Sequence, residues 1–141
     1  MLIALDASAL VHAKALKASA SGGLSGLELV HRTTTLGATF ALSTGVNSEL
    51  VGMSLSTTLE RWKDDELITI HSVGGKAVRQ FDSAVPKRVA RPGRNDQALV
   101  CLAHQLDAVV LTHDTGLATY ARATRLLTID LVDIGALLTH T

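Results

Sequence analysis

Four acidic residues occupy positions from which they could act together on a charged substrate. Asp6 follows the first aliphatic run of the chain, and Asp114 follows a later one. Glu49 and Asp96 lie beside apolar positions of two predicted helices. Oxygen ligands select hard cations, so four carboxylates in one crevice would favour Mg²⁺ or Mn²⁺ over Zn²⁺. Such cations can bridge a phosphodiester, lower the pKa of a bound water and stabilise the leaving oxygen.

Asp6 and Asp114 each end a segment that predicts a buried strand. Ligands of open α/β sheets bind beyond the carboxyl ends of the strands, where the strand order reverses. If strands two and three lie on one side of strand one, and strands four and five on the other, this reversal falls between strands one and four. We then expect the two acids to flank one crevice. Both also have the residue type and position of a helix N-cap, and this alternative stays open.

Glu49 and Asp96 are predicted to point toward the inward faces of their helices. Glu49 comes three residues after Val46, and Asp96 comes three residues before Leu99. Four carboxylates in one crevice cannot all ionise at neutral pH without a compensating charge. Two structural alternatives remain. The helix dipole favours any acid in a first turn, which would explain Asp96 alone, and a slightly displaced helix face would leave Glu49 exposed.

The elements that must position these acids alternate along the chain. Strands are predicted at Leu2–Leu5, Thr39–Leu42, Leu67–Val73, Val109–Thr112 and Leu126–Leu131. Helices are predicted at Ala7–Ala20, Leu24–Leu36, Thr44 (as N-cap) to about Lys63, Asp96–Leu106, Thr115–Ala123 and Val132–Leu138, with Gly74–Arg94 the least regular segment. Strands separated by helices predict parallel pairing in a three-layer α/β/α sandwich.

Length and composition agree with one globular domain over residues 1–141. Hydrophobic residues make up 47% and aromatic residues 3%, so we expect an aliphatic core of the kind found around parallel sheets. The formal net charge of +0 lacks the basic excess of a sequence-specific DNA binder, although a local basic patch would still suit a nuclease. The lone Cys101 excludes an intrachain disulfide. No segment resembles a signal peptide or a membrane span, so we expect a cytoplasmic protein without membrane contact.

A basic cluster precedes Asp96 along the chain. It comprises Lys87, Arg88, Arg91 and Arg94. These cations could draw an RNA backbone toward the acids, because phosphate charge dominates the affinity of proteins for nucleic acids. An ordinary solvated loop would have the same composition, and this alternative also stays open.

Four ordered motifs, which together span nearly the whole chain, resemble those of the PIN-domain family. The opening LIALDAS is similar to the family's first-strand motif, a buried run followed by Asp and a small polar residue. The segment STGVNSEL matches the polar helix opening before its mid-chain Glu. The segment NDQAL resembles its Asp-Ala-hydrophobic helix opening, and VVLTHD resembles its Leu-Thr-x-Asp strand end.

The resemblance implies a five-stranded parallel sheet of order 3-2-1-4-5 and endoribonuclease activity with one or two divalent metals. Carried over by position, the catalytic and metal-binding acids are Asp6, Glu49, Asp96 and Asp114, with Ser8 and Thr112 as hydrogen-bonding supporters.

The resemblance also implies partners. Many bacterial members are VapC-type toxins inhibited by an antitoxin, and many form homodimers. We therefore expect an RNA substrate, an antitoxin partner and a homodimer. Some members carry a further acid or Asn where this chain has Leu117. This difference keeps open the alternative of a catalytically weak PIN domain that binds RNA or a protein.

Overall fold

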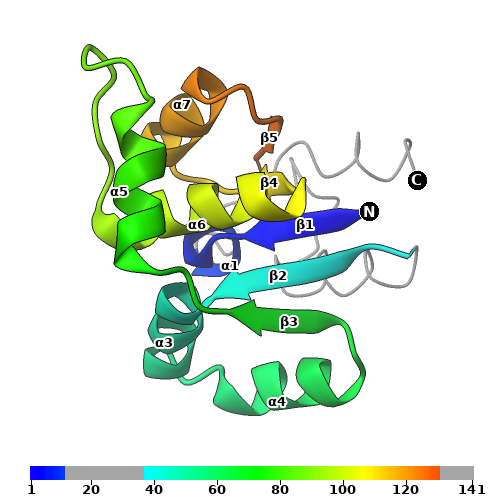
Figure 1. Cartoon of the computed structure of the whole chain (residues 1–141). Helices are drawn as coiled ribbons and strands as arrows, with labels where there is room; N and C mark the ends of the chain where they lie inside the picture. Colours follow the sequence, from blue (N-terminus) through cyan, green and yellow to red (C-terminus); the bar gives the residue numbers. More distant parts are fainter. Residues whose placement is uncertain (12–36, 131–141) are drawn as a thin grey trace.

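The computed structural model describes residues 1–11 and 37–130, which form a parallel sheet flanked by helices (Figure 1). The order of the strands is β3-β2-β1-β4-β5. Their bounds are β1 Leu2–Leu5, β2 Thr39–Ser43, β3 Ile68–His71, β4 Val109–Leu111 and β5 Thr128–Ile129. Each neighbouring pair is parallel. The predicted α/β class, parallel sheet and strand order are therefore confirmed.

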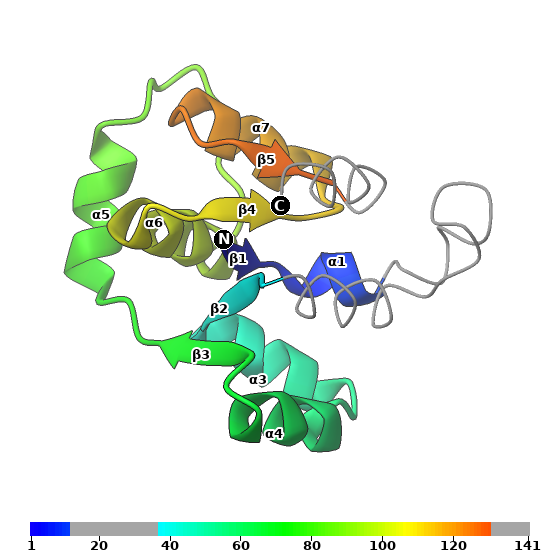
Figure 2. The same cartoon turned by 90° about the vertical axis from the view of Figure 1, so that its right-hand side faces the viewer.

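Helices cover both faces of the sheet. Figure 2 shows α5 and α6 on one side of it and α1, α3 and α4 on the other. The bounds of the helices are α1 Ala7–Val11, α3 Thr44–Gly52, α4 Ser56–Asp64, α5 Gly75–Ser83, α6 Arg94–Leu106 and α7 Thr115–Ala123. The predicted three-layer sandwich is confirmed. Among these helices, none combines the length and the apolar character needed to cross a membrane.

The core is built around β1 and α6. Ile3, Ala4 and Leu5 of β1 are fully buried, and Leu99 and Val100 of α6 are fully buried against the same core. Burying each large aliphatic side chain contributes about 1.5–3 kcal/mol. The central strand β1 is therefore packed on both faces. Asp6, the residue that follows it, has a defined position at the carboxyl edge of the sheet.

The single helix predicted over residues 44–63 is wrong, because the chain forms two helices there. Ser54 lies between them with a φ of 64°, a left-handed conformation that an α-helix cannot continue through. The buried face of the first helix also ends there, since Met53 is 45% exposed and Thr57 is exposed. The helix cap differs too. Ser43, rather than Thr44, is the N-cap of α3.

The segment predicted to be irregular, Gly74–Arg94, contains the helix α5. No side chain caps this helix, whose N-cap is Gly74, so the sequence has no ordinary start signal there. Val78 is buried, and Phe81 packs against the core. Helix α6 starts at Arg94, two residues earlier than predicted, and β3 and β5 are shorter than predicted.

Three predicted helices fall wholly or partly outside the described residues. The helix predicted at Ala7–Ala20 does begin at Ala7, and its described part extends to Val11. The helices predicted at Leu24–Leu36 and Val132–Leu138 lie outside the residues that the structure describes.

Candidate metal centre

The carboxyl ends of β1 and β4 are neighbours, and an acid follows each of them. Leu5 pairs with Leu111 in the parallel register. The backbone N–H of Asp6 donates to the carbonyl of Leu111 at 3.0 Å, which continues the pairing one residue beyond β1. Asp6 and Asp114 therefore leave the sheet at one edge, between strands one and four, where the strand order reverses.

The Asp6 carboxylate is buried and held by two hydroxyl groups. Ser8 Oγ and Thr112 Oγ1 both donate to Asp6 Oδ2, the second at 2.7 Å. The two hydroxyl oxygens lie 3.2 Å apart. Ser8 and Thr112 thus lie where a residue that supports Asp6 must lie. No described residue donates to the other oxygen, Oδ1, so this oxygen can accept a cation.

Asp114 is exposed and caps α7. Its Oδ1 accepts from the backbone N–H groups of Gly116 at 2.8 Å and Leu117 at 3.1 Å. The N-cap alternative is therefore confirmed for Asp114. The cap engages one carboxylate oxygen only, and no described residue donates to Oδ2. Because a carboxylate has two oxygens with about four lone-pair sites, capping is compatible with binding a cation.

Glu49 and Asp96 reach the same edge from α3 and α6. Asn95 Nδ2 donates to Glu49 Oε1 at 3.1 Å, which joins the two helices. Glu49 and Asp96 are both half-buried, and with Gly93, Arg94 and Asn95 they line a cavity of about 350 Å³. Neither side chain is fully exposed, so the structure differs from the alternative in which Glu49 is an exposed helix residue.

The charges that act on Asp96 indicate that all four acids lie close together. Burial, together with the negative charges of Asp6, Asp114 and Glu49, raises the pKa of Asp96 to about 6. A charge influences a neighbour's pKa only when the two groups are close. The structure therefore brings together the four side chains that the sequence singles out.

The donor set fits a hydrated hard cation. In the described part of the chain, no group of three Asp, Glu, His or Cys side chains forms a ready-made cation cage. Mg²⁺ usually needs none, because it keeps several waters and binds one or two carboxylates together with substrate phosphates. The donors here are all carboxylate oxygens, and a cation among them would relieve the repulsion felt by Asp96.

The metal-free protein should gain stability through Asp96 as the pH falls from about 6 to about 4. Its folded-state pKa of about 6 lies above the unfolded value, so between about pH 4 and pH 6 the folded chain binds the proton more tightly. The free energy of unfolding therefore falls as the pH rises through this window. Solvent screening of a half-buried group limits the effect to about 1 kcal/mol. Thermal unfolding in EDTA across this range measures it.

The matched variant for this prediction is Asp96→Asn. It should melt above the wild type at neutral pH, and the difference should shrink toward about pH 4. A difference in melting temperature that stays constant over the range would contradict the prediction. Asp107→Asn, at the other end of α6, should not change the pH dependence of the wild type.

The predicted basic cluster separates in space. Arg94, the first residue of α6, lines the cavity beside Glu49 and Asp96. Lys87 and Arg88 are exposed in the loop after α5. Arg91 turns inward and donates to four backbone carbonyls of that loop and of α5. These hydrogen bonds hold the loop, and RNA contact by all four residues stays a prediction.

Asn95 is a site residue that the sequence did not single out. Its hydrogen bond to Glu49 depends on a close approach of α6 to Gly45 of α3. A Cβ atom at Gly45 would lie 2.7 Å from Asn95 Oδ1, closer than real Cβ contacts. Gly45 is therefore the residue that leaves room for Asn95. The available signal is Gly45 four residues before Glu49, on the same helix face.

Comparison with known proteins shows which solved structures share this fold. No family model matches the chain, and no curated protein matches it in sequence. A PilT N-terminus domain protein from Sulfolobus solfataricus matches with a TM-score of 0.64 and 14% identity, over 96% of this chain and 92% of its own. VapBC2 from Rickettsia felis, solved with a DNA fragment from its promoter, gives 0.60 and 18% over 92% and 98%. VapBC-1 from nontypeable Haemophilus influenzae gives 0.61 and 15% over 93% and 98%. Function must be argued from the site, since one fold can serve many functions.

Proposed function

From the PIN-domain fold, which this chain has, and from the acids at its carboxyl edge, we propose that the protein is a Mg²⁺- or Mn²⁺-dependent endoribonuclease. The observation that supports this most is the convergence of Asp6, Glu49, Asp96 and Asp114 where the strand order reverses. Four carboxylates that repel one another suit a site completed by a cation and a phosphodiester.

Each acid would have a defined part in holding the ion. Asp6 would offer Oδ1, because its Oδ2 is held by two hydroxyls. Asp114 would offer Oδ2, because its Oδ1 caps α7. Glu49 on α3 and Asp96 on α6 would add their negative charges to the site. A bound divalent ion would lower the pKa of a water and stabilise charge on the phosphoryl oxygens.

The proposal includes a biological setting, in which the protein is the toxin of a toxin–antitoxin pair, acts in the cytoplasm and forms a homodimer. Its support is that two structures with the same fold are VapBC proteins. Induced expression of the chain alone should arrest growth, and coexpression of a protein encoded beside it should relieve the arrest. Sedimentation of the purified chain tests the dimer. Growth unaffected by expression would contradict the toxin assignment.

The activity is tested with a structured RNA incubated with Mg²⁺, with Mn²⁺ and with EDTA. Cleavage that needs the metal supports the proposal. A second readout is independent of turnover, since a ligand that binds the native state raises the melting temperature. A metal present at 100 times its Kd would contribute about 2.7 kcal/mol. No cleavage of any RNA, together with no shift at millimolar Mn²⁺, would contradict the proposal.

A catalytically weak PIN domain that binds RNA or a protein is the second candidate. Leu117 is the observation that favours it, because the position where some members carry a further acid is here a fully buried leucine. Its backbone N–H also caps α7 through Asp114. RNA binding of equal strength by the wild type and an Asp6→Asn, Asp96→Asn variant, without cleavage by either, would support this candidate.

Gly45→Ala is expected to weaken Mn²⁺ binding about tenfold, although the new methyl group is not a ligand. It would push the Asn95 amide away from Glu49, and groups that orient ligands typically contribute 10–100-fold to metal affinity. The flexible Asn95 side chain can move, so the loss of stability should stay near 1 kcal/mol. The dependence of the melting temperature on Mn²⁺ concentration measures the affinity.

Two further variants test this prediction, one as a second test and one as a control. Asn95→Ala should weaken Mn²⁺ binding to the same degree, because it removes the same hydrogen bond. Gly52→Ala, later in α3, is the matched control, since a Cβ atom there meets nothing within 4 Å. Equal metal affinity of Gly45→Ala and Gly52→Ala would contradict the role given to Asn95.

A further inference from the structure

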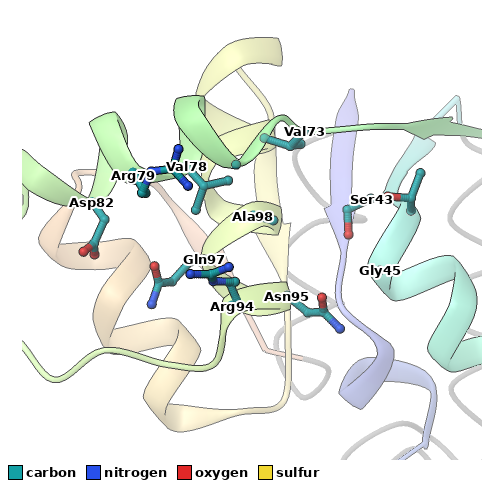
Figure 3. A pocket seen from close by; sticks show the side chains of 12 residues that line it. Ser43, Gly45, Val73, Val78, Arg79, Asp82, Arg94, Asn95, Gln97 and Ala98 are labelled. Carbon is teal, nitrogen blue, oxygen red and sulfur yellow. The ribbon is translucent and has the colours of Figure 1, made fainter.

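A second cavity, of about 410 Å³, is lined by residues of α3, α5 and α6 (Figure 3). Arg79 of α5 and Arg94 and Gln97 of α6 lie on one side of it, and the start of α3 with Ser43 and Gly45 lies on the other. Arg94 and Asn95 line both this cavity and the acid-lined one. The two cavities are therefore neighbours along one edge of the sheet.

Positive charge dominates this second cavity. Its one acid, Asp82, is already satisfied, because Oδ1 accepts from Arg91 Nε at 2.9 Å and from the Tyr120 hydroxyl at 2.8 Å. Within the described chain, no residue forms an ion pair or a hydrogen bond with the guanidinium of Arg79 or Arg94. Two arginines without an ion-pair partner among the described residues thus line this cavity, and one of them, Arg94, also lines the cavity of Glu49 and Asp96.

The rest of the lining is suited to a nucleotide. Val73, Val78 and Ala98 supply an apolar wall against which a base can lie. Gln97 Nε2 donates to the carbonyl of Pro92 at 2.9 Å, so the Oε1 of Gln97 remains as an acceptor for a base edge. Small-molecule sites typically combine such an apolar lining with a few placed polar groups, in volumes of about 300–1,000 Å³.

Resting on the proposed function, we infer that this cavity binds an unpaired nucleotide of the RNA beside the phosphodiester to be cut. The phosphate would lie against Arg79 and Arg94, whose planar donors match phosphate oxygens. One phosphate of the strand would then lie at the acid-lined cavity and a neighbouring one at the arginines. The nucleotide must be unpaired, because bases enter protein pockets from single strands and loops, where they can be splayed out.

The test measures the affinity of the full chain for a labelled single-stranded RNA in EDTA, where metal-dependent cleavage is absent. Arg79→Gln, Arg94→Gln is expected to weaken binding about tenfold. The plot of log affinity against log salt should become shallower by about 0.7, because the one phosphate held by the two arginines contributes about 0.7 for single strands. Arg79→Lys, Arg94→Lys keeps the charge and should retain the wild-type slope, which separates lost charge from misfolding.

The matched control is Arg122→Gln, Arg125→Gln, which removes the same charge in the last turn of α7 and just beyond its C-cap. These two exposed arginines lie toward the amino edge of the sheet, because α7 runs back from β4 to the start of β5. The control should bind RNA within about twofold of the wild type at low salt. Equal weakening by both pairs would overturn the inference, since total charge alone would then explain binding.

The remaining outcomes separate this inference from the proposed activity. Loss of binding in the Arg79, Arg94 variant, with no Mn²⁺-dependent cleavage by the wild type, would uphold the RNA site and reject the nuclease. Metal-dependent cleavage by the wild type, with unchanged RNA binding by the variant, would keep the nuclease and overturn the inference, leaving the cavity to a protein ligand such as an acidic peptide. Absence of RNA binding by the wild type would also overturn it.

Discussion

Asp6→Asn is expected to reduce metal-dependent RNA cleavage about 10³-fold while leaving the fold intact. The amide has the size of the carboxylate and can still accept from Ser8 and Thr112, so the hydroxyl pair keeps its partner. What disappears is the charge of the most buried acid of the site, 4% exposed. Metal-ion catalysis supplies several kcal/mol of charge stabilisation, and each 1.36 kcal/mol corresponds to about tenfold in rate.

The measurement is the initial rate of cleavage in saturating Mn²⁺, beside the melting temperature in EDTA. Asp107→Asn is the matched control. It makes the same chemical change at the C-cap of α6, where φ is 51° and Asn is well tolerated. Its rate should equal that of the wild type. A rate for Asp6→Asn within about tenfold of the wild type would remove Asp6 from the catalytic set.

The sheet was predictable because its central strands are buried on both faces. Strands of this kind are near-continuous aliphatic runs, and β1 and β4 have the sequences Leu-Ile-Ala-Leu and Val-Val-Leu. β1 is followed directly by Asp6, and β4 by Thr112, His113 and then Asp114, and a helix begins directly after each acid. Local sequence was therefore sufficient for these elements, and the strand order came from the family resemblance.

The errors lie where distant contacts decide the local structure. The break between α3 and α4 is made at Ser54, and Leu55 N–H returns to the carbonyl of Leu50 at 3.2 Å. No glycine or proline at position 54 signals this turn. Helix α5 has Gly74 as its N-cap, Gly75 as its first residue and no capping side chain, so its helicity depends on packing of Val78 and Phe81 rather than on propensity.

The acids of the site, the supporting hydroxyls of Ser8 and Thr112, and Arg94 were predicted from the sequence, whereas Asn95 and Arg79 were not. A carboxylate at a strand end is visible in the sequence, because the strand before it is. The hydrogen bond between Asn95 and Glu49 joins residues 46 positions apart on two helices, and the spacing of Gly45 and Glu49 does not name Asn95 as the partner. Arg79 belongs to α5, a helix that the sequence did not predict. The side of the sheet on which Arg79 lies could therefore not be predicted either.

Arg91→Ala is expected to lower the free energy of unfolding by about 3 kcal/mol, the largest loss of stability among the exchanges considered. The guanidinium donates at 2.7 to 3.2 Å to the carbonyls of Asp82, Val85, Pro86 and Val89, and its Nε pairs with Asp82 Oδ1 at 2.9 Å. Hydrogen bonds to charged groups contribute about 1.5–3 kcal/mol, and loss of one partner of a buried pair costs about 3–5. We take the low end, because the two side chains are 26% and 29% exposed.

The loss should exceed that of any single hydrogen bond, because Asp82 would be left with one partner. Burial and the bond to Asp82 raise the pKa of Tyr120, so its hydroxyl stays protonated and cannot neutralise the carboxylate. The melting temperature should fall by about 10 °C. Arg91→Lys should recover little, since one ammonium cannot reproduce the planar fork of donors.

Arg88→Ala, an exposed exchange in the same loop, is the control and should melt within about 2 °C of the wild type. The loop that Arg91 holds leads directly into Arg94, Asn95 and Asp96 at the start of α6. Its loosening should therefore lower cleavage at temperatures at which the variant is still folded, because the acids would lose their fixed separation. Equal melting temperatures for Arg91→Ala and Arg88→Ala would show that the loop is held by other contacts, and the position of Asp96 would then need another explanation.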